Sequence, residues 1–268
     1  MNTIEKEGIS MSVTYEVKTD HIAVITLKRP EAANALSHDL LDELSSIIQK
    51  VKFNDEIRCV IITGAGTRAF CAGADLKERK GMNEQEVIAT VRKIGRTISS
   101  IENISVPTIA AINGAAFGGG LELALACDYR VASDQAVMGL TETSLAIIPG
   151  AGGTQRLSRL IGAGQAKRLI FSATRCDARQ AFDIGLIEKI ESSEQLLDQV
   201  LSEATQIASH GPIALRQAKK AIDLGMQTDL TTGLAIESVC YEQTIATEDR
   251  LEGLQAFAEK RQPKYQGK

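Results

Sequence analysis

The sequence predicts an α/β core followed by a helical region. Over about the first 190 residues, short apolar segments rich in β-branched residues alternate with longer segments whose apolar residues recur at helical spacing. From residue 196 to residue 257 the chain shows three or four amphipathic helical patterns and no convincing strand. We therefore expect a core over residues 12–195 and a helical region over residues 196–268.

The core begins with a hairpin and a helix. Residues 13–17 and 22–27 are apolar, β-branched and partly alternating, which predicts two strands joined by a turn at residues 19–20. Residues 37–52 carry leucine, isoleucine and valine at helical spacing, and Ser37 is suited to cap the amino end of that helix.

The same kinds of pattern predict further strands and helices. Residues 59–63 (CVIIT) and 108–112 (TIAAI) are short and apolar throughout, as buried strands are. Between them, residues 83–104 place valine and isoleucine on one helical stripe, and Pro107 ends that segment. The last helix begins at Thr247, with acidic residues in its first turn and basic residues at its end, an arrangement that the helix dipole favours.

Charge and cysteine spacing argue against several classes of function. The 30 Lys and Arg residues against 34 Asp and Glu give a formal charge of −4, which opposes general affinity for nucleic acids or anionic membranes. The five cysteines are widely spaced and form no C-x-x-C pair, so a zinc ribbon or a thioredoxin-type site is not expected. No apolar run approaches the ~20 residues of a membrane span, and nothing near the N-terminus resembles a signal peptide. We expect a soluble, cytoplasmic protein that binds neither nucleic acid nor membrane.

One glycine loop resembles a nucleotide-binding motif without its context. Residues 64–69 (GAGTRA) follow a strand and fit a loose dinucleotide fingerprint, G-x-G-x-x-A. The next residues form no amphipathic helix, and the acidic residue expected ~20 positions on at the end of a second strand is missing. The chain contains neither a P-loop nor a G-x-S-x-G motif, and its isolated histidines (His21, His38 and His210) receive no role.

Two other glycine-rich stretches suggest a site for a ligand oxygen. Three consecutive glycines, residues 118–120, precede a strong helical run, so their N–H groups are the unsatisfied donors of a helix N-terminus. The stretch FCAGADLK at residues 70–77 also allows close approach to the backbone. Two backbone donors converging on one oxygen would form an oxyanion hole. Glu122 lies in the first turn after the three glycines, and Glu142 lies shortly before another glycine-rich stretch at residues 148–157. Two carboxyl groups beside an oxyanion hole can act as acid and base.

The motifs AFCAGADLKE (residues 69–78), NGAAFGGGLELALACDYRVA (113–132) and IIPGAGGTQRL (147–157) resemble the enoyl-CoA hydratase/isomerase, or crotonase, family. The resemblance covers about residues 12–265 and is strongest to the methylglutaconyl-CoA hydratase branch. It implies a crotonase-like ββα spiral core with a C-terminal helical trimerisation region, and a homo-oligomer that is a trimer or a dimer of trimers. It implies no metal and no cofactor, because CoA arrives as part of the acyl-CoA thioester substrate.

The resemblance also assigns roles to individual residues. The N–H groups of Ala74 and Gly119 would hold the thioester oxygen. Glu122 would deprotonate the water that attacks the β-carbon, and Glu142 would help to hold that water and deliver a proton to the α-carbon, in a syn addition. The matching substrate-binding and CoA-binding positions are Ala72, Asp75, Leu76, Lys77, Gly150, Phe257 and Lys260. Among these, Gly150 would contact the catalytic water through its backbone, and Phe257 and Lys260 would reach the CoA of an adjacent subunit.

Alternatives remain open at this point. Many isomerases of the family retain the Glu142-like position and lack the Glu122-like one, so the presence of both favours hydration over a double-bond shift. An isomerase or another acyl-CoA lyase remains the alternative within the family. RNA binding, described for some relatives through a lysine-lined helix, is disfavoured because residues 37–52 hold three acidic residues and only two lysines. A catalytically inactive scaffold is disfavoured because both carboxylates and both glycine loops are intact. Acyl-chain preference depends on several loops, including residues 77–85, and the sequence does not separate fatty-acid from leucine degradation.

Overall fold

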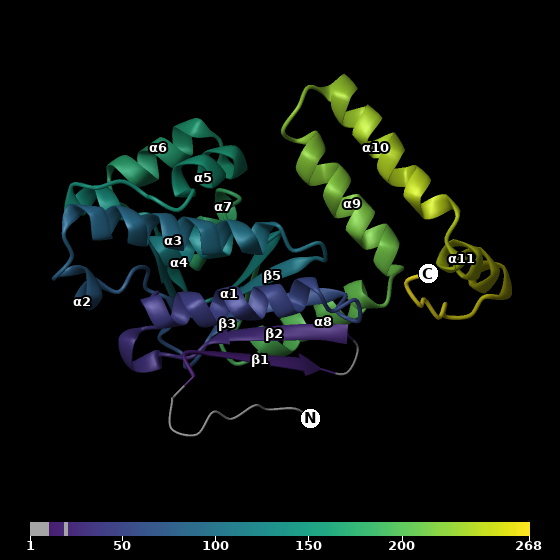
Figure 1. The fold of residues 1–268 in the computed structure, drawn as a ribbon, viewed down its shortest axis with the longest axis horizontal. Coiled ribbons are helices and arrows are strands. Elements are labelled where there is room, and N and C mark those ends of the chain that lie inside the picture. Colours follow the sequence, from purple (N-terminus) through teal and green to yellow (C-terminus); the bar gives the residue numbers. More distant parts are fainter. Residues whose placement is uncertain (1–10, 19–20) are drawn as a thin grey trace.

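The computed structural model describes residues 11–18 and 21–268, and the turn predicted at residues 19–20 lies outside them. The strands form two sheets, with helices around them (Figure 1). In the described residues the larger sheet has six strands in the order β1-β2-β3-β5-β7-β10, and the smaller has four in the order β4-β6-β8-β9. The strands of the larger sheet are β1 (Val13–Lys18), β2 (Ile22–Leu27), β3 (Cys59–Gly64), β5 (Thr108–Ile112), β7 (Tyr129–Ser133) and β10 (Lys189–Glu191). Those of the smaller sheet are β4 (Ala69–Cys71), β6 (Ala115–Phe117), β8 (Val137–Gly139) and β9 (Cys176–Asp177).

Helices follow the pairs of strands along the chain and make up its C-terminal region. The helices are α1 (His38–Lys52), α2 (Leu76–Arg79), α3 (Glu84–Glu102), α4 (Gly119–Leu125), α5 (Gly153–Ile161), α6 (Ala163–Phe171), α7 (Ala178–Asp183), α8 (Leu196–Ala208), α9 (Pro212–Gly225), α10 (Leu230–Ile245) and α11 (Glu248–Glu259). Short 3-10 helices occupy η2 (Pro30–Ala32) and η3 (Glu142–Leu145). The pairs β3/β4, β5/β6 and β7/β8 each place one strand in the larger sheet and the next in the smaller, before a helix leads on. This repetition is the expected ββα spiral.

The larger sheet is buried on both faces. Along β2, Ala23 and Ile25 face a core that includes α1 and α3, while Ile22 and Val24 face a second core. That second core is closed by Val200 and its neighbours on α8. Strands covered on both sides read as continuous apolar runs, which is why CVIIT and TIAAI were recognisable in the sequence.

The predicted hairpin and helix caps are confirmed. β1 and β2 pair antiparallel, with Val13 opposite Leu27. The side chain of Ser37 accepts a hydrogen bond from the N–H of Leu40, and that of Thr247 caps α11 in the same way. At the start of α3, Asn83 and Glu86 form a complete capping box, which places the helix start where the sequence predicted it.

The C-terminal helices differ in how they meet the core. α8 packs on the larger sheet, whereas α9 and α10 form a helical hairpin that projects away from the sheets, with α11 beyond it (Figure 1). The tail after α11 turns back, and the guanidinium of Arg58 donates to the carbonyl of Tyr265. The helical region expected from residue 196 is present, and the division of the chain at residues 195/196 stays a prediction.

We expect Gly120→Ala to lower stability by about 3 kcal/mol, at the upper end of ordinary overpacking costs. A methyl group there would overlap the carbonyl oxygen of Cys71, because α4 starts directly against β4. The matched control is Gly164→Ala in α6, where a Cβ meets nothing within 4 Å and alanine should stabilise the helix by up to about 1 kcal/mol. Urea unfolding of both variants measures the difference, and equal stability of the two would contradict the close packing described here.

Candidate active site

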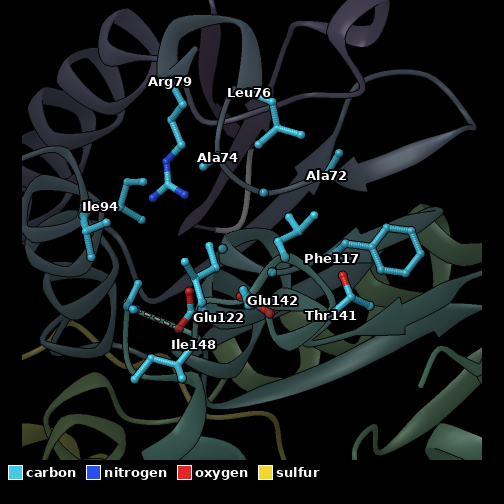
Figure 2. Close-up of a pocket in the computed structure, with 18 of the residues that line it drawn as sticks. Ala72, Ala74, Leu76, Arg79, Ile94, Phe117, Glu122, Thr141, Glu142 and Ile148 are labelled. Carbon is cyan, nitrogen blue, oxygen red and sulfur yellow. Dashed lines mark hydrogen bonds between the residues drawn. The ribbon is translucent and has the colours of Figure 1, made fainter. Parts of the chain in front are cut away.

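A cavity of about 800 Å³ opens between α2, α3, the start of α4 and the loop that includes η3 (Figure 2). Most of its lining is apolar, and the ionisable side chains that line it are two carboxylates and two guanidinium groups. The lining residues that the sequence had already singled out are Ala72, Ala74, Leu76, Gly119, Glu122, Glu142 and Gly150. The two glycine loops and the two glutamates, distant in sequence, therefore meet in one cavity.

Two backbone N–H groups are available at one wall of this cavity. A Cβ built on Gly119 would lie 3.8 Å from the nitrogen of Ala74, so the two amides are close neighbours. The N–H of Leu36 donates to the carbonyl of Gly73, and the carbonyl of Leu36 accepts from the N–H of Asp75. The N–H of Ala74, which lies between them, therefore points away from Leu36. Gly119 is the first residue of α4, where a helix offers no internal acceptor. Within residues 11–18 and 21–268, neither N–H donates to a protein acceptor.

Glycine is required at two positions beside these two amides, where the backbone bends at the cavity wall. Gly73 has φ +93° and Gly118 has φ +50°, backbone conformations that L side chains rarely adopt. A Cβ on Gly73 would also lie 2.8 Å from the carbonyl oxygen of Phe117. These two glycines therefore let the two loops approach each other and bring their amides together.

Glu122 is buried, with 2% of its surface exposed, and is held by the backbone of another loop. Its Oε1 accepts hydrogen bonds of 2.7 Å from the N–H groups of both Ala151 and Gly153. Burial raises the pKa of Glu122 above its usual value, while those two donors and the charge of Arg156 oppose the rise. The carboxylate is thus fixed in position by one oxygen.

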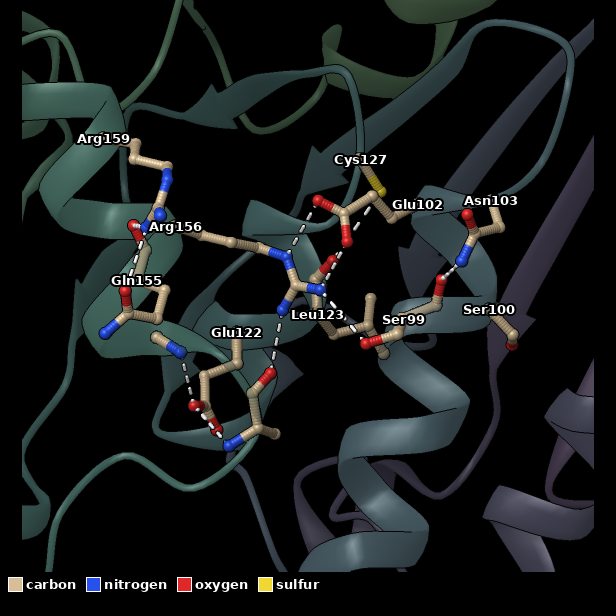
Figure 3. Close-up of polar contacts among 12 residues, drawn as sticks. Ser99, Ser100, Glu102, Asn103, Glu122, Leu123, Cys127, Gln155, Arg156 and Arg159 are labelled. Atoms are coloured by element: carbon tan, nitrogen blue, oxygen red, sulfur yellow. Dashed lines mark hydrogen bonds and ion pairs between the residues drawn. The ribbon is translucent and has the colours of Figure 1, made fainter. Parts of the chain in front are cut away.

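Arg156 in turn fixes the loop that holds Glu122 (Figure 3). Its Nη1 donates to the carbonyl of Ala151 at 2.9 Å, and its Nη2 pairs with Glu102 at the end of α3 at 2.6 Å. The guanidinium also occupies the space where a Cβ on Gly152 would lie, and Gly152 has φ +104°. This clamp of contacts around Arg156 explains the glycine at position 152 and holds the loop whose two N–H groups donate to Glu122.

Glu142 lies on η3 and faces the same cavity (Figure 2). Its Oε2 is buried and has no hydrogen-bond partner among the described residues. Burial, with a contribution from the negative charge of Glu122, raises the pKa of Glu142 to about 7. The two carboxyl groups therefore differ in their surroundings, because one has two backbone donors and the other has an unsatisfied oxygen.

Two of the predicted substrate-binding residues, Asp75 and Lys77, do not line the cavity. Asp75 pairs with Arg29 at 3.0 Å and accepts from the N–H of Lys77, which caps α2. It does not line the cavity, and the side chain of Lys77 is exposed to solvent. Asp75 thus anchors the segment that carries the Ala74 amide, and direct contact of either residue with CoA stays a prediction.

The two C-terminal positions are far from the cavity within the single chain. Phe257 lies on α11 with 88% of its surface exposed, and Lys260 ends that helix in a left-handed conformation. Neither lines the cavity, and α11 stands at the opposite end of the molecule from α2 (Figure 1). A role for them in binding the CoA of another subunit requires an assembly that one chain does not contain.

Several lining residues were not identified from the sequence. The N–H groups of Ala151 and Gly153, which fix Glu122, belong to a motif that was noted without that role. Arg79 was missed, although it falls in the segment 77–85 that was expected to influence acyl-chain preference. The guanidinium of Arg175 lies 4.9 Å from the ring centre of Phe117 at the cavity wall. No periodicity identifies such residues, because they lie in irregular segments or at the ends of short elements.

Among the described residues, no group of three or more His, Cys, Asp and Glu side chains is arranged to hold a metal ion. No helix in the same residues combines the length and the apolar character needed to span a bilayer.

Comparison with known proteins places the chain in a family. The sequence pattern of the enoyl-CoA hydratase/isomerase family matches residues 18–268. The Bacillus subtilis protein YngF, placed by its name in the same family, is 57% identical over 256 residues, covering 96% of this chain and 98% of its own. The mitochondrial methylglutaconyl-CoA hydratase of Mus musculus is 53% identical over 250 residues, covering 92% of this chain and 80% of its own.

A solved structure agrees with these sequence relatives. The crystal structure of an enoyl-CoA hydratase from Bacillus anthracis has a TM-score of 0.95 to this chain at 52% identity. The match covers 96% of this chain and all of that one, including the spiral core and the C-terminal helices. The chain therefore belongs to the enoyl-CoA hydratase/isomerase family.

Proposed function

We propose that the protein is an enoyl-CoA hydratase, which adds water across the α,β double bond of an enoyl-CoA thioester to give a 3-hydroxyacyl-CoA. The observation that carries the proposal is the meeting of two unpaired N–H groups and two unlike carboxyl groups in one cavity. CoA enters as part of the substrate. The family membership supports acyl-CoA chemistry, and the reaction type is argued from the site.

The two N–H groups supply the electrostatic part of the reaction. When water attacks the β-carbon, negative charge develops on the thioester oxygen as an enolate. The amides of Ala74 and Gly119 would donate to that oxygen and hold the charge. Because both donors belong to the backbone, no side-chain substitution removes either of them cleanly.

The carboxyl groups would divide the proton transfers. Glu122, whose carboxylate accepts two backbone hydrogen bonds, is suited to remain ionised and to take a proton from the attacking water. Glu142, with a raised pKa of about 7, is suited to carry the proton that the α-carbon receives. The family resemblance implies a syn addition, in which both groups are delivered to one face of the substrate, and both carboxyl groups line the cavity that would hold it.

A double-bond shift is the competing reaction. An isomerase moves a proton from one carbon to another and needs no second carboxyl group to activate water. Glu122 is buried and positioned by a dedicated clamp, and this arrangement favours a role in water activation. Initial rates with crotonyl-CoA and with a 3-enoyl-CoA separate the reactions, because a hydratase consumes the 2-enoyl thioester to a hydroxyacyl product. Conversion of the 3-enoyl thioester alone would favour isomerisation.

The site also predicts a pH dependence. We expect kcat/KM to fall as the pH rises above about 7, because Glu142 must be protonated to deliver its proton and its pKa is raised to about 7. At lower pH the rate should hold until Glu122 becomes protonated, and its pKa is also above the usual value. Initial rates across a buffer series give the two apparent pKa values, which belong to the coupled pair. A kcat/KM that rises through pH 7 would contradict the assignment of Glu142 as the acid.

The acyl group that the protein prefers would decide whether it acts as a methylglutaconyl-CoA hydratase or on other enoyl-CoA thioesters. Relatives named methylglutaconyl-CoA hydratase are among the most similar sequences, which supports 3-methylglutaconyl-CoA as a candidate substrate. The ratio of kcat/KM for 3-methylglutaconyl-CoA to that for crotonyl-CoA tests this choice. A ratio well above one would favour the leucine pathway over general fatty-acid oxidation.

We also propose that the chain forms a trimer or a dimer of trimers through its C-terminal helices. Large apolar side chains are exposed along α9, α10 and α11, a surface that soluble monomers rarely present. They include Ile222, Met226, Leu230, Leu234, Val239, Tyr241, Leu251, Leu254 and Phe257. The mass in solution by light scattering tests the assembly, and a monomer would remove the role suggested for Phe257 and Lys260. The cytoplasmic location expected from the sequence stays a prediction.

A further inference from the structure

Arg79 ends α2 and extends its side chain into the cavity (Figure 2). The wall around it is apolar, with Val87, Val91 and Ile94 contributed by α3. A guanidinium group stays charged at any physiological pH, so this wall carries a permanent positive charge among hydrocarbon side chains.

Among the described residues, the guanidinium of Arg79 has no hydrogen-bond or ion-pair partner. Its Nε is buried without a hydrogen bond, and within residues 11–18 and 21–268 no carboxylate forms an ion pair with Arg79. The other arginines that pack inside the fold are paired, as Arg29 is with Asp75 and Arg130 with Glu188. Arg79 as a whole is half-buried and borders the open cavity. A ligand that fills the cavity would displace water from the guanidinium, and a desolvated charge without a partner is costly, so such a ligand should itself supply the partner.

We propose that Arg79 binds a carboxylate carried by the acyl chain of the substrate, which makes it the residue that selects carboxylated enoyl-CoA thioesters over apolar ones. The proposal rests on the proposed function, because it assigns the end of the acyl chain in the same cavity. A carboxylate matches the planar donor fork of arginine in two parallel hydrogen bonds. An apolar chain would leave the guanidinium desolvated and unpaired, which rejects that chain.

The segment that carries Arg79 also fixes the spacing between its guanidinium group and the proposed thioester site. Ala74, one of the two proposed donors to the thioester oxygen, precedes Arg79 by five residues. Between them Asp75 caps α2 and is itself held by two hydrogen bonds of 3.0 Å from Arg29. The N–H of Arg79 bonds back to the carbonyl of Asp75. One anchored turn therefore sets the spacing between the thioester site and the guanidinium group.

Two other roles for Arg79 fit the observations less well. If it served to pair with Glu142, the buried Oε2 of Glu142 would have a donor, and it has none. The influence of Arg79 on Glu142 is a longer-range attraction of charges. If it bound a phosphate of CoA, that phosphate would have to reach the cavity that holds the thioester, although the whole pantetheine arm separates the two groups.

Binding of unreactive analogues tests the proposal without turnover. Glutaryl-CoA carries a terminal carboxylate, and 5-methylhexanoyl-CoA replaces its two oxygens by methyl groups in the same shape. Isothermal titration should show that Arg79→Met weakens binding of glutaryl-CoA by about 100-fold relative to 5-methylhexanoyl-CoA, in the range for one partner of a desolvated charge pair. Arg79→Lys should retain part of the preference, because it keeps the charge and loses the fork. The control Lys80→Met removes an exposed cation next along the chain and should leave the ratio unchanged.

Turnover then connects binding to specificity. The ratio of kcat/KM for glutaconyl-CoA to that for 5-methyl-2-hexenoyl-CoA should fall by about 100-fold in Arg79→Met. The ratio cancels any effect that Arg79 has on Glu142, because both substrates depend on Glu142 equally. Far-UV circular dichroism and the mass in solution show whether the variant folds and assembles as the wild type does.

The outcomes separate this proposal from the proposed function. An unchanged ratio of the two affinities in folded Arg79→Met would overturn the role of Arg79, even if hydration proceeds. An equal loss of affinity for both analogues and for acetyl-CoA would overturn it in favour of a phosphate contact. Conversely, a lost preference for glutaryl-CoA in a protein that hydrates neither enoyl substrate would support Arg79 and refute the hydratase.

Discussion

Replacing Glu122 by glutamine is expected to lower kcat for hydration by ~100-fold or more, the usual range for a general acid or base. The single oxygen of Glu122 that accepts from Ala151 and Gly153 has a counterpart in the amide oxygen of glutamine. The substitution therefore keeps the loop in place and removes the basic group. Steady-state kinetics with crotonyl-CoA measure the loss, with KM expected to change much less than kcat.

The control for Glu122→Gln is Glu84→Gln, which also neutralises a glutamate but at an exposed position in the first turn of α3. Its kcat should stay within about two-fold of the wild type, because exposed helix-terminal charges contribute weakly. If Glu122→Gln folds with unchanged unfolding temperature and retains near-normal turnover, Glu122 is not the base. The burial and the clamp would then serve only to maintain the structure.

Glu142→Gln is expected to lower kcat by a similar ~100-fold and to remove the alkaline limb of the pH profile, since the titrating acid is gone. It should not lower stability. The pKa of Glu142 is raised from 4.5 to about 7 by burial, so ionisation of this group opposes folding. The stability that the protonated form contributes is complete below the unfolded pKa and is lost as the pH rises through 7.

The unfolding temperature of Glu142→Gln should therefore equal or exceed that of the wild type, with the difference growing between pH 4.5 and about 7 and then levelling off. Thermal scans at several pH values measure this trend. A variant that becomes less stable relative to the wild type as the pH rises would mean that the folded protein stabilises the ionised form of Glu142. The same result would reverse its assignment from acid to base.

The parts of the fold that could be predicted are those with a regular pattern of apolar residues or a recognisable helix-capping residue. The runs at 59–63 and 108–112 became β3 and β5 because a sheet covered on both faces requires continuous apolar strands. Ser37 and Thr247 marked helix starts because short polar side chains satisfy the first N–H groups of a helix. The smaller sheet was not predicted, because strands of two or three residues such as β6 and β9 carry no measurable alternation.

The candidate site could be predicted where a short stretch of sequence is unfavourable for the stability of the fold. Three consecutive glycines before a helix cost backbone entropy, and that cost drew attention to the loop. The two glutamates were singled out only by the glycine loops beside them, and both line the cavity with Gly118 and Gly119. Arg79 and Arg156 could not be placed, because on a helix an arginine is more often a surface residue than a cavity residue. Only the path of the chain brings Arg156 to the loop that holds Glu122, and Arg79 to the apolar wall of α3.

The most direct test of the account is the product formed by the wild-type protein from crotonyl-CoA and 3-methylglutaconyl-CoA in water enriched in oxygen-18. The account predicts loss of the conjugated double bond and a product heavier than the substrate by one molecule of labelled water, with the label on the β-carbon. A product of unchanged mass from the folded protein, or no consumption of either thioester, would contradict hydration, and the role of Glu122 would be the first to be abandoned.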